Sequence, residues 1–491
     1  MNFISGENRN QITLMPDNID DYVDENNAVR VIDAYIAHLD LGKLGFAKPQ
    51  PNDTGRPMYD PKDLLKLYLY GYMNRVRSSR RLETETKRNL EVIWLMNKLS
   101  PDHKTIARFR HDNTVALKNV FRDFVKLCMK QGLYGRELVA IDGSKFKAVN
   151  SKDRNFTDKK LTERISRINA KIDEYLHQLE DSDSEENTAT GEKSSEEIAK
   201  IICELKKRKT SYEGYAAELQ EGSDTQKSLT DSDSRLMMAN GKLDVCYNIQ
   251  TAVDSKNKMV AEFEVTNEAV DKNQLTPMAE RTKETLEVQT ITAVADTGYD
   301  SVQDIVRSMG QGITPHVAGA NFDICLPSNN DFEIVIESHQ NGRCVYDAER
   351  NIVLCPMGKM LYPGFYKKTK GVGAYYNFKE CSKCACKCTT EKRGKRHQVP
   401  MKESDFKKTY DDRNLSVRQI RIAPDKKIIK QRKSIVEHPF GTVKRNMDSG
   451  YCLTKGKGNV TGEFSLAFLA YNFKRAINIL GIRKIIEAVQ R

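Results

Sequence analysis

The sequence of 491 residues contains no long apolar run and only one tryptophan. No stretch approaches the roughly 18 consecutive apolar residues of a membrane-spanning helix. The segment from Met1 to Arg9 lacks the apolar core of a signal peptide. These two absences exclude integral-membrane and secreted proteins, so we expect a soluble protein of the cytoplasm. Trp94 is expected in a hydrophobic core rather than against a nucleic-acid base.

The cysteines do not indicate a disulfide framework, because their number, 11, is odd and most are scattered singly. Four of them cluster between 381 and 388, and Cys355 opens a turn-like stretch. Clustered cysteines in an intracellular chain are typical of metal binding, and Zn²⁺ takes four tetrahedral sulfur or nitrogen ligands. The predicted ligands of one structural Zn²⁺ ion are Cys355, Cys381, Cys384 and Cys388, with Cys386 as an alternative and His397 as a weaker one. A thiol-rich surface loop without metal is the competing hypothesis.

The charge is positive overall and unevenly spread. Lys and Arg exceed Asp and Glu by 11, although the stretch 180–197 is strongly acidic. Such a positive excess indicates a polyanionic partner, most often nucleic acid. A solvated basic surface without a partner is the alternative.

Residues 1–130 have a helical pattern in which basic residues stand beside apolar ones. Asp60-Pro61 is a typical helix start, and Ser100-Pro101-Asp102 opens a later helix. Short helices with basic faces are typical of helix-turn-helix DNA-binding domains. The candidate DNA contacts in this region are Arg75, Arg77, Arg80, Arg81, Lys104 and Arg108. An ordinary helical bundle with a solvated face is the alternative.

Short apolar runs with branched residues then predict buried strands. These runs are 137–141, 243–254, 258–265, 289–295 and 313–318. Helical patterns at 274–287 and 301–309 alternate with the later strands. A hairpin followed by strand–helix–strand units predicts a mixed sheet covered by helices, and hence an α/β fold.

Two heptad-like patterns interrupt this order. Apolar residues recur every three or four positions from Leu161 to Leu179 and again from Ile198 to Leu219. The acidic, Ser-rich segment between them has almost no apolar residue to pack. We therefore expect an insertion of two antiparallel coiled-coil helices joined by a loop.

Two of the predicted strands are followed directly by an aspartate, Asp142 and Asp296. A carboxylate there lies where ligands bind in α/β sheets, although either aspartate alone also suits a turn or a helix N-cap. A later helical stretch places Glu437 on the same face as Lys433 and Lys444. Three such carboxylates could hold two Mg²⁺ ions about 3.5–4 Å apart for phosphodiester chemistry. An exposed ion-pair stripe is the alternative for Glu437.

Several short motifs follow one another along nearly the whole chain. They are Gly55-Arg56-Pro57, Tyr59-Asp60-Pro61, Ala140-Ile141-Asp142-Gly143, Tyr247-Asn248-Ile249-Gln250, Ala295-Asp296-Thr297-Gly298-Tyr299, Val436-Glu437-His438-Pro439-Phe440-Gly441-Thr442-Val443-Lys444 and Ala470-Tyr471-Asn472-Phe473-Lys474-Arg475. In their order and spacing they resemble the DDE transposases of bacterial insertion sequences, of the type with an InsH-like helical N-terminal domain.

The resemblance implies a ribonuclease H-like catalytic domain whose triad is Asp142, Asp296 and Glu437, with Mg²⁺, or Mn²⁺, as the cofactor. Lys444 stands at the family's spacing after the glutamate, which implies a DNA contact. The family's tyrosine and arginine before the glutamate are replaced by lysines in this chain, and a lysine cannot form the bidentate fork of an arginine. Further candidate DNA contacts on this helix are Lys433, Arg432 and Arg445.

The resemblance also implies a function. The protein would bind the terminal inverted repeats of its insertion sequence, cleave the ends and join the 3′-hydroxyls to target DNA, in the cytoplasm at the bacterial nucleoid. A homodimer is expected because two ends must be paired. The alternatives are a catalytically silent, transposase-derived DNA-binding protein and a metal-dependent nuclease of the same fold. A coiled-coil interaction protein is supported only by residues 160–220.

The expected domain organisation has six segments. They are a helical DNA-binding domain (1–130), the first part of the catalytic domain (131–155), the coiled-coil insertion (156–222), the second part of the catalytic domain (223–325), a Cys-rich, basic insertion (326–425) and the segment with the glutamate helix and the C-terminal helix (426–491).

Overall fold

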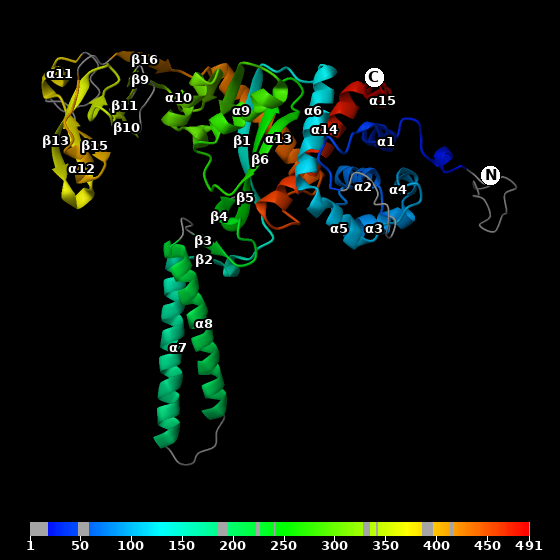
Figure 1. Cartoon of the computed structure of the whole chain (residues 1–491), viewed down its shortest axis with the longest axis horizontal. Helices are drawn as coiled ribbons and strands as arrows, with labels where there is room; N and C mark the ends of the chain where they lie inside the picture. The colour runs from blue at the N-terminus through cyan, green and yellow to red at the C-terminus, as the bar shows by residue number, and fades with distance from the viewer. Residues whose placement is uncertain are drawn as a thin grey trace, which may run out of the picture.

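The computed structural model describes residues 18–47, 58–184, 195–221, 226–239, 241–327, 334–339, 342–384, 396–412 and 416–490. Figure 1 shows N-terminal helices beside a central sheet, a long helical hairpin that projects away from that sheet, and a second sheet on the side away from the N-terminal helices. The protein is thus a mixed α/β structure, as predicted. Within the described ranges, no helix is both long and apolar enough to span a bilayer.

The N-terminal helices begin at capping side chains. Asp60 accepts a hydrogen bond from the amide of Lys62 at 2.8 Å, and Asp102 accepts one from the amide of Thr105 at 2.8 Å, which confirms both predicted helix starts. The helices are α1 (Ala28–His38), α2 (Pro61–Met73), α3 (Ser79–Arg88), α4 (Leu90–Leu95), α5 (His103–Asp112) and α6 (Thr114–Lys130), after a short 3-10 turn η1 (Ile19–Tyr22). The motif Gly55-Arg56-Pro57 lies outside the described residues.

The central sheet has six strands in the order β4-β5-β1-β7-β8, with β6 paired to β5. Its strands are β1 (Leu138–Lys147), β4 (Arg235–Ala239), β5 (Lys242–Asp254), β6 (Val260–Thr266), β7 (Ile291–Ala295) and β8 (Ile313–Val317). β1 runs antiparallel to β5 but parallel to β7, and β7 runs parallel to β8. The expected mixed sheet is therefore confirmed.

The first strand is longer than its apolar run predicts. β1 continues past Ile141 to Lys147, because β5 pairs with it from Asp142 opposite Thr251 to Lys147 opposite Cys246. On its other side, β1 pairs with β7 only from Leu138 to Ala140. Asp142 therefore lies within a strand, at the point where that strand loses its parallel neighbour.

Helices pack against this sheet and join it to the N-terminal region. These helices are α9 (Leu275–Leu286), α10 (Val302–Gly310), α13 (Lys426–Gly441) and α14 (Lys457–Leu480). The last helix, α15 (Ile482–Gln490), packs against α1 and α14. The rings of Phe146 and Phe464 meet at 4.7 Å, and those of Phe263 and Phe468 at 5.0 Å. α14 also packs along α6 and α2, so one apolar core is shared by the sheet and the N-terminal helices.

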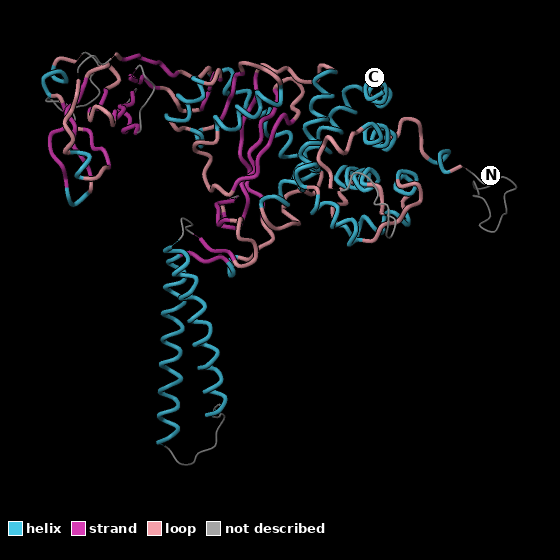
Figure 2. Tube along the Cα trace, viewed as in Figure 1, coloured by secondary structure: helices cyan, strands magenta, loops and turns pink. Residues whose placement is uncertain are grey.

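The helical hairpin consists of α7 (Asp158–Ser184) and α8 (Ser195–Glu221), which run antiparallel as predicted (Figures 1 and 2). Ile168 and Ile172 of α7 pack against Ile198 and Ile202 of α8. The two-stranded ladder of β2 (Asn155–Thr157) and β3 (Gln226–Ser228) forms the base of the hairpin. The acidic residues between 185 and 194 lie outside the described residues.

A second sheet lies where the sequence pattern predicted no strands. Its strands are β9 (Phe322–Pro327), β10 (Ile334–His339), β11 (Gly342–Asp347), β12 (Ile352–Leu354), β13 (Met360–Lys367), β14 (Val372–Tyr376), β15 (His397–Pro400) and β16 (Val417–Ile422), with the short helices α11 (Phe378–Ser382) and α12 (Glu403–Phe406). Its small core contains Tyr346, Val353 and Tyr375. Strands as short as β12 carry too few residues for an alternating pattern to stand out.

Candidate active site

The sheet places Asp142 and Asp296 side by side. Ala140 of β1 is opposite Val294 of β7 in a parallel register, and each aspartate follows two residues later. β7 ends at Ala295, whereas β1 continues, so the two carboxylates meet at an open edge of the sheet, a typical ligand-binding position. Asp296 is at the same time the N-cap of a short turn, and its Oδ1 accepts a hydrogen bond from the amide of Gly298 at 2.8 Å.

A guanidinium lies between these two carboxylates. Nη1 of Arg432 is 3.6 Å from Oδ1 of Asp142 and 4.0 Å from Oδ2 of Asp296. This nitrogen is buried and has no hydrogen-bond partner among the described residues. Both distances exceed a hydrogen bond, so the positive charge is shared between the carboxylates without being tightly bound to either.

Burial raises the pKa of Asp142 to about 6, the charge of Arg432 opposes this rise, and the charges of Asp296 and Asp271 add to it. The edge of the sheet therefore concentrates negative charge that a cation would stabilise. Carboxylate oxygens are the ligands that Mg²⁺ prefers. The carboxylates of Asp142 and Asp296 thus fit a hard divalent cation. In the protein without metal or DNA, the guanidinium of Arg432 is the positive charge next to them.

Glu437 faces away from this pair. The buried residues of α13 include Ile435 and Val436, and Arg432 points to the same inner face. Five residues later, Glu437 lies about 140° around the helix from Arg432. Its side chain is 65% exposed, and its carboxylate is 3.7 Å from Nζ of Lys433. The structure thus brings together two members of the predicted triad and leaves the third beside Lys433.

Lys444 reaches the strand that carries Asp142. Its Nζ donates to Oγ of Ser144 at 2.6 Å and to the carbonyl of Lys145 at 3.2 Å, and it lies 4.4 Å from the ring centre of Phe146. Burial lowers the pKa of Lys444. The lysine belongs to a π-helical turn, Thr442–Asn446, that continues α13, and such turns are frequent at functional sites.

Asp271, which no sequence pattern indicates, lies next to the same edge. Its carboxylate accepts hydrogen bonds from Asn248, Gln250 and Lys145, and its charge is among the causes of the raised pKa of Asp142. Asp271 precedes α9 in a polar loop, and one aspartate in such a loop carries no signal that a single sequence can reveal.

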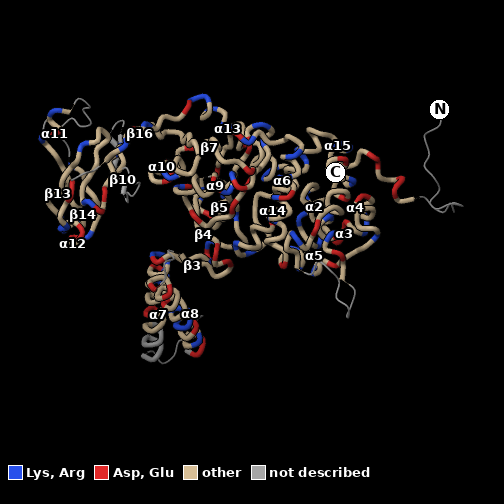
Figure 3. Tube along the Cα trace, turned by 45° about the horizontal axis from the view of Figure 1, so that its top comes forward, with Lys and Arg blue, Asp and Glu red and all other residues tan. Residues whose placement is uncertain are grey.

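The predicted DNA contacts of the N-terminal helices divide into exposed and buried residues. The side chains on the exterior are Arg75, Arg80, Arg81, Lys104 and Arg108. Figure 3 shows basic residues around α3 and α5. Arg77 is different: it is 3% exposed, its Nη1 is 3.1 Å from Glu463, and it lies over the ring of Tyr451. The structure therefore does not support Arg77 as a DNA contact, because its charge is already paired inside the protein.

The remaining candidates on and after α13 also differ in position. Lys433 and Arg445 are exposed, whereas Arg432 lies over the aspartates.

Three of the four predicted zinc ligands are described. The thiols of Cys381 and Cys384 are near enough to Cys355 to contribute to its raised pKa, of which burial is the main cause. The amide of Lys359 donates to Sγ of Cys355 at 3.3 Å. Cys386 and Cys388 lie outside the described residues, and within the described part of the chain no three His, Cys, Asp or Glu side chains form a metal-binding group. His397 is buried, with its Nε2 3.9 Å from Sγ of Cys344.

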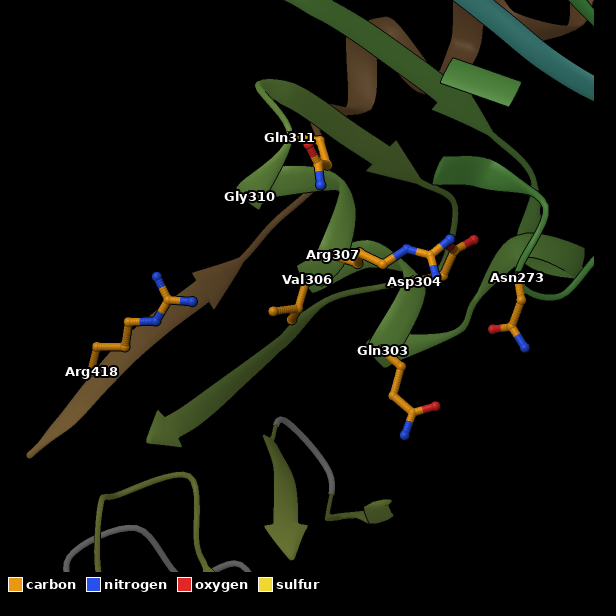
Figure 4. Close-up of a pocket in the computed structure, with 8 residues that line it drawn as sticks. All are labelled: Asn273, Gln303, Asp304, Val306, Arg307, Gly310, Gln311 and Arg418. Atoms are coloured by element: carbon orange, nitrogen blue, oxygen red, sulfur yellow. The ribbon is translucent and has the colours of Figure 1, made fainter. Parts of the chain in front are cut away.

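A hollow of about 520 Å³ lies elsewhere, between α10 and β16 (Figure 4). Its lining includes Asn273, Asp304, Arg307 and Arg418 and none of the predicted site residues. Asp304 is committed to structure there, because its carboxylate accepts hydrogen bonds from the amides of Leu275 and Thr276 at the start of α9.

Comparison with known families gives two matches. A transposase domain (DUF772) matches residues 17–112, and a transposase DDE domain matches residues 354–477. The first range contains the exposed basic residues of α3 and α5, and the second contains Glu437 and Lys444, whereas Asp142 and Asp296 lie outside both. No curated protein and no solved structure matches the chain. The two family matches, in this order along one chain, support a DDE transposase of the insertion-sequence type.

Proposed function

We propose that this transposase binds the terminal inverted repeats of its insertion sequence, cleaves the ends by divalent-metal-dependent hydrolysis and joins the 3′-hydroxyls to target DNA. The observation that carries the proposal is the meeting of Asp142 of β1 with Asp296, which directly follows the neighbouring parallel strand β7, in a chain with a match to a transposase DDE domain. The strand order, with an antiparallel hairpin followed by parallel strands, supports a ribonuclease H-like fold for the central domain, with the helical hairpin and the second sheet as insertions into it.

Asp142 and Asp296 would hold the metal, and Glu437 would complete the set. When bound, Mg²⁺ would activate water or a 3′-hydroxyl and stabilise the leaving oxygen of a phosphodiester. Without metal, Arg432 offsets part of the negative charge of the two carboxylates. With metal bound, its long side chain would be available for a DNA phosphate. Lys444 places an ammonium over β1, two residues along from Asp142, where it would orient a phosphate of the bound end.

The exposed arginines and lysines of α3 and α5 would contact the DNA backbone. Arg80 and Arg81 of α3, Lys104 and Arg108 of α5, and Arg75 in the loop before α3 lie on the exterior of the region matched by the transposase domain. Phosphate contacts of this kind position a protein on DNA without specifying a sequence. Pairing of two ends requires two copies of the chain, so a homodimer on DNA is part of the proposal.

A cleavage assay tests the proposal. The protein and a Glu437→Gln variant are incubated with Mg²⁺ and a plasmid that carries the DNA flanking the gene. We expect cuts at defined ends with the wild type alone. Binding without cutting by both proteins would favour the catalytically silent DNA-binding alternative, and cuts by both would remove Glu437 from the triad.

A structural zinc ion in the second sheet is a separate part of the proposal. The thiols of Cys381 and Cys384 are near enough to Cys355 to contribute to its raised pKa, and the amide-to-thiol bond at Cys355 would stabilise a thiolate there. Elemental analysis of freshly purified, reduced protein should find about one zinc per chain. Protein that is folded and free of zinc would contradict this part and leave the cleavage proposal intact.

A further inference from the structure

Gly143 and Gly298, which follow the predicted metal ligands Asp142 and Asp296, both lie close to the carboxylate of Asp271. A Cβ atom at Gly143 would lie 2.4 Å from Oδ1 of Asp271, and one at Gly298 would lie 3.6 Å from Oδ2 of Asp271. The first distance is shorter than real Cβ contacts, so residue 143 must be a glycine while Asp271 keeps this position. Neighbouring residues of a strand face opposite sides of the sheet, so Asp271 approaches from the face opposite to Arg432 and α13.

Asp271 is held rigidly in that place. Its Oδ1 accepts hydrogen bonds from Asn248 at 2.7 Å, from Gln250 at 2.7 Å and from Nζ of Lys145 at 3.1 Å, and Lys145 also reaches Oδ2 at 3.1 Å. Asn248 and Gln250 are fully buried on β5, opposite Lys145 and Gly143 of β1. The carboxylate of Asp271 therefore bridges β1 and β5 by hydrogen bonds next to Asp142.

The same network reaches the second aspartate. The hydroxyl of Tyr299 donates to Oε1 of Gln250, and Tyr299 lies in the short turn capped by Asp296. Gln250 thus joins Asp271 to the segment after Asp296. Oδ1 of the fully buried Asn248 has no hydrogen-bond partner among the described residues and lies 2.9 Å from the position of a Cβ at Gly143, so this cradle is polar and closely fitted around the strand.

We propose that Asp271 is a positioning residue for the divalent metal, because it sets the separation of Asp142 and Asp296 through Gly143, Gln250 and Tyr299. The inference rests on the proposed function. Mg²⁺ requires a nearly ideal octahedral arrangement of ligands, whereas Ca²⁺ accepts flexible geometry. A residue that fixes the ligands should therefore matter more for Mg²⁺ than for Ca²⁺, while a residue that acts only through its charge or through overall stability should affect both ions alike.

The test is calorimetric titration of the full-length, DNA-free protein with Mg²⁺ and separately with Ca²⁺. We expect Asp271→Asn to weaken Mg²⁺ binding about tenfold, the scale of a lost outer-shell partner, and Ca²⁺ binding by at most about threefold. Asp254→Asn is the matched control: this fully buried carboxylate accepts hydrogen bonds from the amides of Gly135, Arg136 and Lys256 near the start of β1, and its loss should change neither affinity. Circular dichroism checks the fold of each variant.

Tyr299→Phe removes one hydroxyl from the network and keeps the shape of a buried ring, so it serves if Asp271→Asn does not fold. A loss that is selective for Mg²⁺ in this variant supports the proposal. Equal losses for both ions, or no loss, overturn it. An Asp142→Asn variant distinguishes failure of the positioning role from failure of the metal site. If only this variant loses Mg²⁺ binding, Asp271 has no positioning role but the metal site is supported. If it too binds Mg²⁺ like the wild type, the metal site of the proposed function fails as well.

Discussion

The ionised carboxylate of Asp142 lowers the stability of the metal-free folded protein, although its position suits the binding of a cation. Its pKa is raised from 3.8 to about 6 in the folded protein, chiefly by burial. A carboxyl with a raised pKa binds its proton more tightly in the folded state than in the unfolded chain. The free energy of unfolding therefore falls as the pH rises from about 4 to about 6, and this loss persists at higher pH.

Asp142→Asn should consequently make the metal-free protein more stable at pH 7.5, by on the order of 2 kcal/mol. The gain should shrink toward zero near pH 4, where the carboxyl is protonated in the folded protein. Urea unfolding of both proteins in the presence of a chelator, at the two pH values, measures this difference. A variant that is less stable than the wild type at pH 7.5 would show that Asp142 has a structural role instead.

Arg77 shows how burial separates a structural cation from a DNA contact. Its ion pair with Glu463 is almost completely buried, and the carboxylate also accepts hydrogen bonds from the amides of Leu453 and Thr454. Arg77→Ala would leave this carboxylate buried without its cation, so the free energy of unfolding should fall by about 3–5 kcal/mol. The neighbouring Arg81→Ala should change it by less than about 0.5 kcal/mol. Chemical denaturation compares them, and equal, small effects would contradict the structural role.

At the scale of elements, the helices and strands that could be predicted from the sequence are the ones that short local patterns specify. Capping residues predict the helix starts at Asp60 and Asp102. Apolar spacing predicts the contact between the two helices of the hairpin. The extension of β1 past Ile141 did not, because it depends on pairing with β5, which is distant in sequence. The same holds for Asp271, whose partners on β1 and β5 come together only in the folded sheet, and for the strands around Cys355.

The site was partly visible in the sequence for a related reason. Asp142 and Asp296 follow apolar runs that become neighbouring strands, so their proximity follows from strand order. The orientation of α13 could not be derived, because it depends on which residues fill the interface with the sheet. The structure places Arg432 on that face and leaves Glu437 exposed.

We expect the helical hairpin to help pair the two DNA ends, because its two helices form a separate coiled coil that projects from the central sheet. The apolar residues of α7 and α8 pack against each other, and the β2–β3 ladder forms the base of the hairpin. Residues 161–219 can therefore be removed without removing any strand of the central sheet. We expect this deletion to weaken the assembly of paired ends and to spare the binding of a single end. Gel-shift assays with one labelled end measure both complexes, and unchanged paired-end assembly would contradict the role.

At the scale of the whole molecule, basic residues on one region should dominate DNA affinity. The chain carries a formal charge of +11, but acidic residues alternate with basic ones along much of the chain (Figure 3). The exposed cations of α3 and α5 would therefore act as a local patch rather than as part of a uniform field.

Replacing Arg80, Arg81, Lys104 and Arg108 together by Gln should make the dependence of log K on log salt less steep by about 3 to 4, because each lost phosphate contact contributes about 0.9. The matched control removes the same charge from four exposed positions of α8, which are Lys200, Lys206, Lys207 and Arg208. Affinities for an end-containing duplex at several salt concentrations give both slopes. A similar change in the two variants would show that net charge, not the patch, sets the affinity.

The central claim, that Asp142 and Asp296 support transposition, is tested most directly by a strand-transfer measurement. Labelled duplexes that carry the flanking ends are incubated with a target plasmid, Mg²⁺ and either the wild-type protein or an Asp296→Asn variant. We predict that the wild type joins labelled 3′ ends to the plasmid and that the variant binds the ends without joining them. Joining by both proteins, or cleavage without any joining by the wild type, would contradict the account.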